Sequence, residues 1–158
     1  MLDRYRLMVA SVAVGLVLLV AGAAKLRQAG WPATAAAFGA PRWLAAVIPW
    51  VEVTVGALLV SGAGLPWTAL AAAGLLASFT AAVAVRLGLG QAVPCGCFGE
   101  TSPRPVGVAT LVRNLVLLGT CTGAVLTGTR PAGPASVALG AAGAAAFLVA
   151  TRARAGTR

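Results

Sequence analysis

Histidine is absent from this chain of 158 residues, and acidic residues are scarce. The three acids are Asp3, Glu52 and Glu100, against 12 lysines and arginines, so the net charge is +9. Without histidine, the chain offers no imidazole to serve as a general base or as a metal ligand. Any chemistry must therefore come from cysteine, lysine, arginine, tyrosine or one of these acids.

Charged residues of either sign are also rare. They make up 9% of the chain, compared with about 25% in a typical soluble domain, whereas 59% of the residues are hydrophobic. Such a composition cannot cover a water-exposed surface, so we expect an integral membrane protein. The basic residues are scattered at segment ends and do not gather on one face. This distribution suits contact with anionic membrane lipid, and we expect no nucleic-acid partner.

Four long apolar segments predict membrane-spanning helices at residues 7–24, 43–60, 67–85 and 106–126. At about 1.5 Å per residue, such segments cross or nearly cross a hydrocarbon core of ~30 Å. An alternative for the first segment is a cleaved signal peptide, with Arg4 and Arg6 as its basic region. An Ala- and Gly-rich segment at 134–150 predicts a fifth helix, followed by a basic tail at 151–158. We therefore expect an all-α integral membrane helical bundle that forms one domain, residues 1–158.

A short interfacial helix, a proline within a span and a tight turn are also predicted. Residues 25–42 break the apolar pattern, and we expect a short helical piece at 33–38 to lie at the membrane interface, a depth that suits Trp31. Pro49 lies inside the second predicted span and should kink it or mark the start of its regular part. The turn signal SGAGLP at 61–66 makes the second and third spans antiparallel neighbours.

The alternation of spans brings the unusual residues to one membrane face. Lys25 ends the first span at this face, Glu52 lies in the nearer half of the second, and Arg113 lies about two turns into the fourth. The loop between the third and fourth spans carries Cys95 and Cys97 at the same face. Ionisable groups within spans usually face inward and pair, so Lys25 or Arg113 is the expected partner of Glu52. The alternative is that the two cations are flanks that extend to the headgroups and that Glu52 is purely structural.

The Cys-Gly-Cys sequence at 95–97 has three interpretations. Two cysteines at this spacing can close a small, strained disulfide that is easily reduced, and a nearby cation would stabilise the thiolate, as in a thiol–disulfide exchange site. Two thiolates could instead bind Cu(I), or the pair could be structural. Zinc would lack its other two ligands. We favour the redox pair and expect no metal. Cys121 lies near the opposite face, where we expect a small buried residue.

Four stretches of the chain resemble the MauE family of methylamine-utilisation membrane proteins, which is grouped with DoxX-like redox-associated membrane proteins. These stretches are SVAVGLVLLVAGAAKL, PWVEVTVG, PCGCFG and LVRNLVLL. The resemblance covers roughly residues 7–126, the predicted four-helix core, and its most specific element is the Cys-x-Cys-Phe-Gly loop. The positions that carry it over are Lys25, Glu52, Cys95, Cys97, and Arg113 with Asn114.

The resemblance implies disulfide chemistry outside the cytoplasm, together with thioredoxin-like partners, in support of the maturation of methylamine dehydrogenase. Four helices with a cysteine loop at one end also look like the DsbB and vitamin K epoxide reductase membrane oxidoreductases, which pass electrons between thiols and a quinone. This chain departs from them because it has one cysteine pair where they have two. A relay through a second pair is therefore not available within this chain.

The first functional hypothesis is a membrane thiol–disulfide oxidoreductase. Cys95 and Cys97 would exchange electrons with a thioredoxin-like extracytoplasmic protein, and a membrane quinone is the candidate for the other end of the path. Lys25 or Arg113 would stabilise the thiolate, and Glu52 would position the cation or move a proton.

The same hypothesis assigns Trp50, Phe98 and Asn114 to the quinone site, although an aromatic belt explains the tryptophan equally well. The second hypothesis is a non-catalytic membrane anchor or assembly partner of a maturation factor, in which the loop disulfide is structural. A small-solute or metal–thiol transporter is a third, weaker interpretation, because no polar stripe runs along several spans.

The two available guides to orientation disagree. With five spans, the cysteine face collects more basic residues than the other face, and the positive-inside rule would place it in the cytoplasm. Disulfide chemistry and the family resemblance place it outside. We expect a multi-pass protein of the plasma membrane with the loop of Cys95 and Cys97 on the extracytoplasmic side.

Overall fold

The computed structural model describes residues 2–91, 107–127 and 142 of the chain. This part of the chain is all-helical. Its five helices are α1 (Leu2–Arg27), α2 (Trp31–Ala37), α3 (Arg42–Ser61), α4 (Trp67–Gly88) and α5 (Val108–Thr127). The predicted helix at 134–150, apart from residue 142, and the basic tail lie outside the described residues.

Three of these helices are long and apolar enough to cross a membrane: α1 over Val9–Arg27, α3 over Arg42–Ser61 and α4 over Trp67–Gly88. A shorter apolar helix covers Val108–Gly123 within α5. The four predicted spans thus correspond to α1, α3, α4 and α5, and the chain is a multi-pass membrane protein. The turn at 61–66 reverses the chain between α3 and α4, as its glycines and proline predict, and Gly62 ends α3 in the left-handed conformation (φ 70°).

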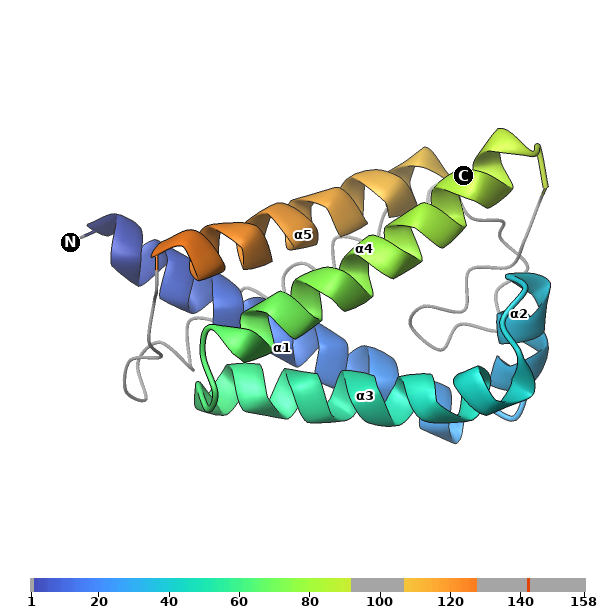
Figure 1. The fold of residues 1–158 in the computed structure, drawn as a ribbon, viewed down its shortest axis with the longest axis horizontal. Coiled ribbons are helices and arrows are strands. Elements are labelled where there is room, and N and C mark those ends of the chain that lie inside the picture. Colours follow the sequence, from blue (N-terminus) through green and yellow to red (C-terminus); the bar gives the residue numbers. More distant parts are fainter. Residues whose placement is uncertain (1, 92–106, 128–141, 143–158) are drawn as a thin grey trace.

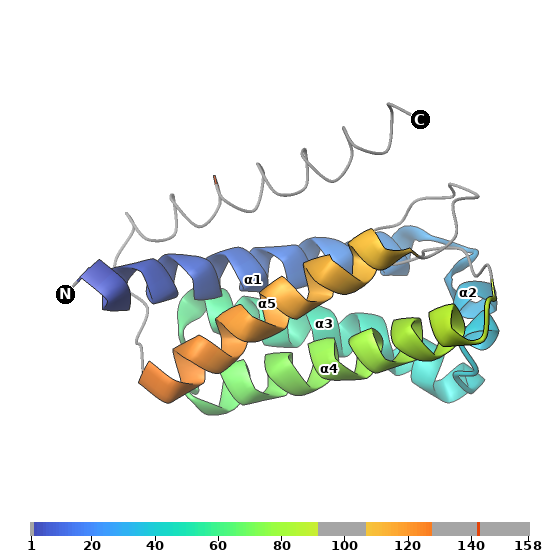
Figure 2. The ribbon, with the colours of Figure 1, turned by 90° about the horizontal axis from the view of Figure 1, so that it is seen from above.

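The long helices run alternately up and down the bundle, with α1 packed mainly against α3 and α4 against α5 (Figures 1 and 2). The C-terminal ends of α1 and α4 and the N-terminal ends of α3 and α5 lie at one end of the bundle, which we call the loop end. Helix α2 lies across this end, beside the start of α3 (Figure 1). The ends of four long helices and the whole of α2 therefore surround one small region.

Glycines set the close approach of α1 and α3. A Cβ at Gly22 would lie 2.7 Å from the carbonyl oxygen of Pro49, and a Cβ at Gly56 would lie 2.6 Å from the carbonyl oxygen of Gly15. Neither distance is possible for a real side chain, so these helices can be this close only where Cβ is missing. Small residues serve the same purpose in other membrane bundles, where backbone proximity replaces the hydrophobic driving force of water.

The core of the bundle lies between all four long helices. Its buried side chains are Val14, Val17 and Leu18 from α1, Val55 and Leu59 from α3, Ala69, Ala72 and Leu76 from α4, and Leu117 and Cys121 from α5. Cys121 is 2% exposed and is a free thiol. It lies in the later part of α5, away from the loop end, which confirms the expectation of a small buried residue there.

We predict that Gly22→Val destabilises the protein, because the new side chain must displace the backbone of α3. Overpacking of this kind typically lowers stability by about 1–3 kcal/mol, which thermal unfolding in detergent would register as a lower melting temperature. The control is Gly74→Val in α4, where a Cβ meets nothing within 4 Å. Equal melting temperatures for the two variants would contradict the close packing of α1 and α3.

Candidate functional site

Lys25 and Glu52 meet between α1 and α3 near the loop end. Side chains on a helix lean towards its N-terminus. Because α1 and α3 are antiparallel, Lys25 leans back into the bundle while Glu52 leans towards the loop end. Gly22 leaves the space through which they meet, since a Cβ there would lie 3.0 Å from the Cβ of Glu52.

The two side chains form a buried ion pair. The Lys25 ammonium Nζ donates a hydrogen bond to Oε1 of Glu52, and the residues are only 3% and 1% exposed. Of the two partners predicted for Glu52, Lys25 is thus the one that the structure pairs with it. The second carboxylate oxygen, Oε2, is buried and has no hydrogen-bond partner among the described residues. The pair accordingly keeps both acceptor capacity on the acid and two N–H donors on the ammonium.

Two aromatic rings complete the surroundings of the ammonium. Nζ of Lys25 lies 4.8 Å from the ring centroid of Trp31 and 4.6 Å from that of Phe79. Both distances are within the range of cation–π attraction, which is worth about 2 kcal/mol or more where the cation is desolvated. The cation therefore interacts with residues from α2, α3 and α4.

Trp31 owes its inward position to Pro49. Helix α3 is continuous from Arg42 through Pro49, so the regular part of this span does not begin at the proline. Proline has no N–H, and the carbonyl of Ala45, four residues earlier, therefore loses its usual helical donor. The indole Nε1 of Trp31 donates to this carbonyl oxygen at 2.6 Å. This bond ties α2 to α3 and satisfies a backbone group that membrane lipid could not satisfy.

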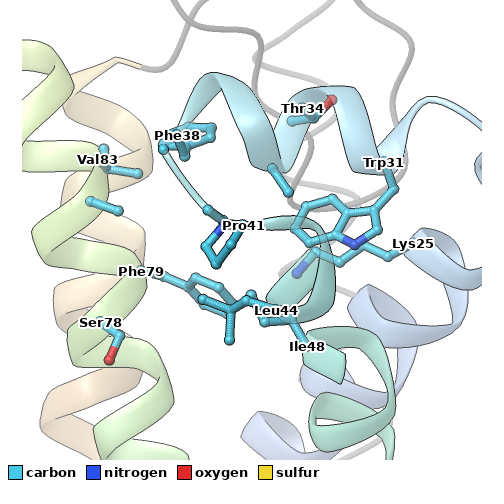
Figure 3. Close-up of a pocket in the computed structure, with 14 residues that line it drawn as sticks. Lys25, Trp31, Thr34, Phe38, Pro41, Leu44, Ile48, Ser78, Phe79 and Val83 are labelled. Atoms are coloured by element: carbon cyan, nitrogen blue, oxygen red, sulfur yellow. The ribbon is translucent and has the colours of Figure 1, made fainter. Parts of the chain in front are cut away.

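A cavity of about 280 Å³ lies beside this cluster, between α2, α3 and α4. Its wall is mainly apolar and includes Trp31, Phe38, Leu44, Ile48 and Phe79, with Lys25 as its charged residue. Figure 3 shows the Lys25 side chain running beneath the Trp31 indole, while Phe79 points from α4 towards the same space. The arrangement is that of a small-molecule site, in which an apolar pocket holds one strongly polar group.

The other predicted site residues that the structure describes do not line the cavity. Arg113 is half-buried and Asn114 is 4% exposed, both in the second turn of α5. Trp50 is 62% exposed on α3 and does not line the cavity, so its assignment to a quinone site stays a prediction without structural support. Cys95, Cys97 and Phe98 lie outside the described residues.

The helices on either side of the cysteine segment are described. Helix α4 ends and α5 begins at the loop end, so the chain on either side of residues 92–106 attaches where the ion pair lies. Among the described residues, no group of three or more cysteine, aspartate or glutamate side chains could hold a metal ion. The described chemistry of this end is therefore that of one ion pair beside an apolar cavity.

Sequence reasoning missed Trp31 and Phe79 as members of the site. Trp31 suited a membrane-interface position, but it is 9% exposed and packs against Ala35 and Ala45. The signal that could have found it is the proline in α3, because the freed carbonyl of Ala45 needs a donor from outside the helix. Phe79 gives no comparable signal, since an aromatic residue in an apolar span is equally suited to face lipid.

Comparison with known proteins identifies a family. The family model described as methylamine utilisation protein MauE matches residues 4–128. The methylamine utilization protein MauE of Paracoccus denitrificans is 40% identical over 116 residues, which cover 70% of this chain and 61% of that protein. The chain thus spans less than two thirds of the length of this relative. No solved structure gives a significant match.

We predict that Trp31→Phe destabilises the protein by about 1–2 kcal/mol, partly because the carbonyl of Ala45 loses the donor that Trp31 supplies from outside α3. In a Pro49→Ala background, the new backbone N–H can bond this carbonyl, so the same tryptophan substitution should be less harmful. A double-mutant cycle of unfolding in detergent should give a coupling free energy of about 1 kcal/mol. Additive effects of the two substitutions would contradict the assigned bond.

Proposed function

The chain belongs to the MauE family, and from this premise we propose that it is a membrane thiol–disulfide oxidoreductase that serves methylamine utilisation. In this proposal, Cys95 and Cys97 exchange a disulfide with a thioredoxin-like extracytoplasmic protein, which then passes it on to proteins that mature outside the cytoplasm. A membrane quinone receives the electrons.

The observation that carries the proposal is the buried pair of Lys25 and Glu52 at the loop end. An ionised residue within a membrane span is unfavourable by roughly 2.5–3.5 kcal/mol on insertion scales, so such residues usually mark functional sites. Here the pair lies at the end of the bundle to which the Cys-Gly-Cys segment is attached. This shared end of the bundle supports a joint role for the pair and the cysteines.

Oxidation of the Cys95 and Cys97 thiols to a disulfide releases two electrons and two protons, which convert a quinone to its quinol. A thiolate of the thioredoxin-like partner then attacks this disulfide and forms a mixed disulfide. The second thiol of the partner resolves it, so the partner leaves oxidised and both cysteines return as thiols.

Charged residues near the loop end would stabilise the thiolate and transfer the proton. We assign the stabilisation of the thiolate to Arg113, because it lies in the second turn of α5, the helix that follows the cysteine segment in the chain. Glu52 can take up or release a proton through the carboxylate oxygen that has no partner among the described residues. Its position inside the bundle suits proton movement towards a bound quinone.

We also propose that the segment of Cys95 and Cys97 faces the extracytoplasmic side. A disulfide persists there, whereas cytoplasmic thiol systems would reduce it. The alternative membrane anchor would have the same orientation, so sidedness and catalysis need separate tests.

We predict that a single substitution, Cys95→Ser or Cys97→Ser, traps a mixed disulfide with a thioredoxin-like protein. The remaining thiolate can attack the disulfide of an oxidised partner in the reverse reaction, but the second loop thiol that would complete the exchange is missing. Cells quenched with acid and alkylated should show this species on non-reducing gels, with the partner identified by mass spectrometry. Cys121→Ala, which removes the thiol in the core, should behave as the parent chain does. If the Cys95→Ser/Cys97→Ser double variant supports growth on methylamine as well as the parent, the non-catalytic anchor is correct.

We predict that an impermeant maleimide labels Cys95 and Cys97 in intact cells after mild reduction. The chain for this measurement carries Cys121→Ala, so that any label reports the loop alone. Labelling only after lysis would place the loop in the cytoplasm and overturn the proposed orientation.

A further inference from the structure

The cavity at the loop end has one strong hydrogen-bond donor. Its volume of about 280 Å³ is near the lower end of the roughly 300–1,000 Å³ typical of small-molecule sites. Two hydroxyls contribute to its wall, but that of Ser78 donates to the carbonyl of Gly74 at 2.8 Å and that of Thr34 to the carbonyl of Gly30 at 3.3 Å. The indole N–H of Trp31 is likewise used, by the carbonyl of Ala45. Among the polar lining side chains, the ammonium of Lys25 is thus the one with N–H groups beyond those in its bond to Glu52.

The charge of this donor selects the kind of acceptor. Glu52 already neutralises Lys25, so a bound anion would leave a net negative charge in a region of low dielectric. A bound cation would face the ammonium directly. A neutral molecule with a carbonyl oxygen avoids both penalties and accepts one of the two N–H groups that Glu52 does not use.

The shape and chemistry of the wall favour a flat ring. The rings of Trp31 in α2, of Phe38 directly after α2 and of Phe79 in α4 border the same space (Figure 3). Aromatic faces stack on a conjugated ring more favourably than on a flexible acyl chain. The cavity also lies among helices that cross the membrane, where lipid-soluble molecules are concentrated.

We propose that this cavity binds the ring of a lipid-soluble quinone, with Lys25 donating a hydrogen bond to one quinone oxygen and with Trp31 and Phe79 beside the ring. The inference gives the quinone of the proposed function a site, and it replaces Trp50 with Lys25, Trp31 and Phe79 as the binding residues. The role of the bound quinone as electron acceptor rests on the proposed function. Binding of the quinone, however, does not require Cys95 or Cys97.

The fluorescence of Trp31 provides the test. Trp43, Trp50 and Trp67 are 67%, 62% and 74% exposed and do not line the cavity, so replacing all three with phenylalanine leaves Trp31 as the only reporter. Purified full-length protein in detergent is titrated with decylubiquinone, a benzoquinone with a ten-carbon tail. We expect saturable quenching, whereas quenching that only rises linearly with quinone in the micelle would overturn the site.

Two sets of variants locate the binding. Ala82→Leu fills the cavity from α4 and should weaken the affinity about tenfold or more, while Ala81→Leu on the exposed face of the same helix should not change it. Lys25→Met/Glu52→Met removes both charges together, which is tolerated better than removing one. If its melting temperature is retained, its affinity should fall about tenfold, because a hydrogen bond from a charged donor is lost. Equal affinity in the Ala82→Leu and Ala81→Leu variants would overturn the assignment.

Competition identifies the ligand chemistry. Arg86 lies near Gly39 on the cavity wall, 3.2 Å from where a Cβ of that glycine would be, so an anion is the strongest rival. Decanoate that displaces the quinone at equal concentration would show an anion site, and methyl decanoate that does so would show a site for lipid ester carbonyls. Either result overturns the inference. Repeating the titration with Cys95→Ser/Cys97→Ser separates the two proposals, because quinone binding should persist even where thiol exchange is lost.

Discussion

The ion pair between Lys25 and Glu52 is the interaction on which the loop end depends. Burying either charge alone between these helices is unfavourable, and α1 and α3 lie close enough for the two side chains to pair. The glycines of the α1–α3 contact provide that distance, and the rings of Trp31 and Phe79 then surround the ammonium. The single charged group in the cavity wall follows from where this pair lies.

Much of this arrangement could be predicted from residue patterns. The apolar segments locate α1, α3, α4 and α5 to within a few residues, because a membrane imposes a minimum length on each span and permits few charges within it. Counting spans places Lys25, Glu52 and Arg113 at one end of the bundle. The pairing of Glu52 then follows from the energetic penalty of an isolated charge, although the pattern alone leaves Lys25 and Arg113 as equal partners.

What the pattern could not supply is the rotation of each helix about its axis. In a soluble helix, polar residues mark the outer face, but lipid-facing and buried positions of a membrane helix are both apolar. Trp31 and Trp50 both suit a membrane interface by residue type, yet Trp31 is buried beside Lys25 and Trp50 is 62% exposed. The cavity depends on these rotations and on the short helix α2, so no motif marks it. The roles of Cys95 and Cys97 stay predictions, since their segment lies outside the described residues.

The separation of 27 residues between the two charges also has a meaning for biosynthesis. At roughly 5–20 residues per second, Lys25 leaves the ribosome about 1–5 s before Glu52, so the cation must exist for a time without its partner. Lys25 lies two residues from the end of α1, where a long side chain can reach the headgroups in the meantime. Glu52 lies in the middle of α3, from where its shorter side chain cannot reach the headgroups. By the time Glu52 is made, however, Lys25 has already been synthesised. Because Lys25 precedes Glu52 in the chain, the lysine can stay at the membrane surface until the glutamate is made. The glutamate can then pair with a lysine that is already present.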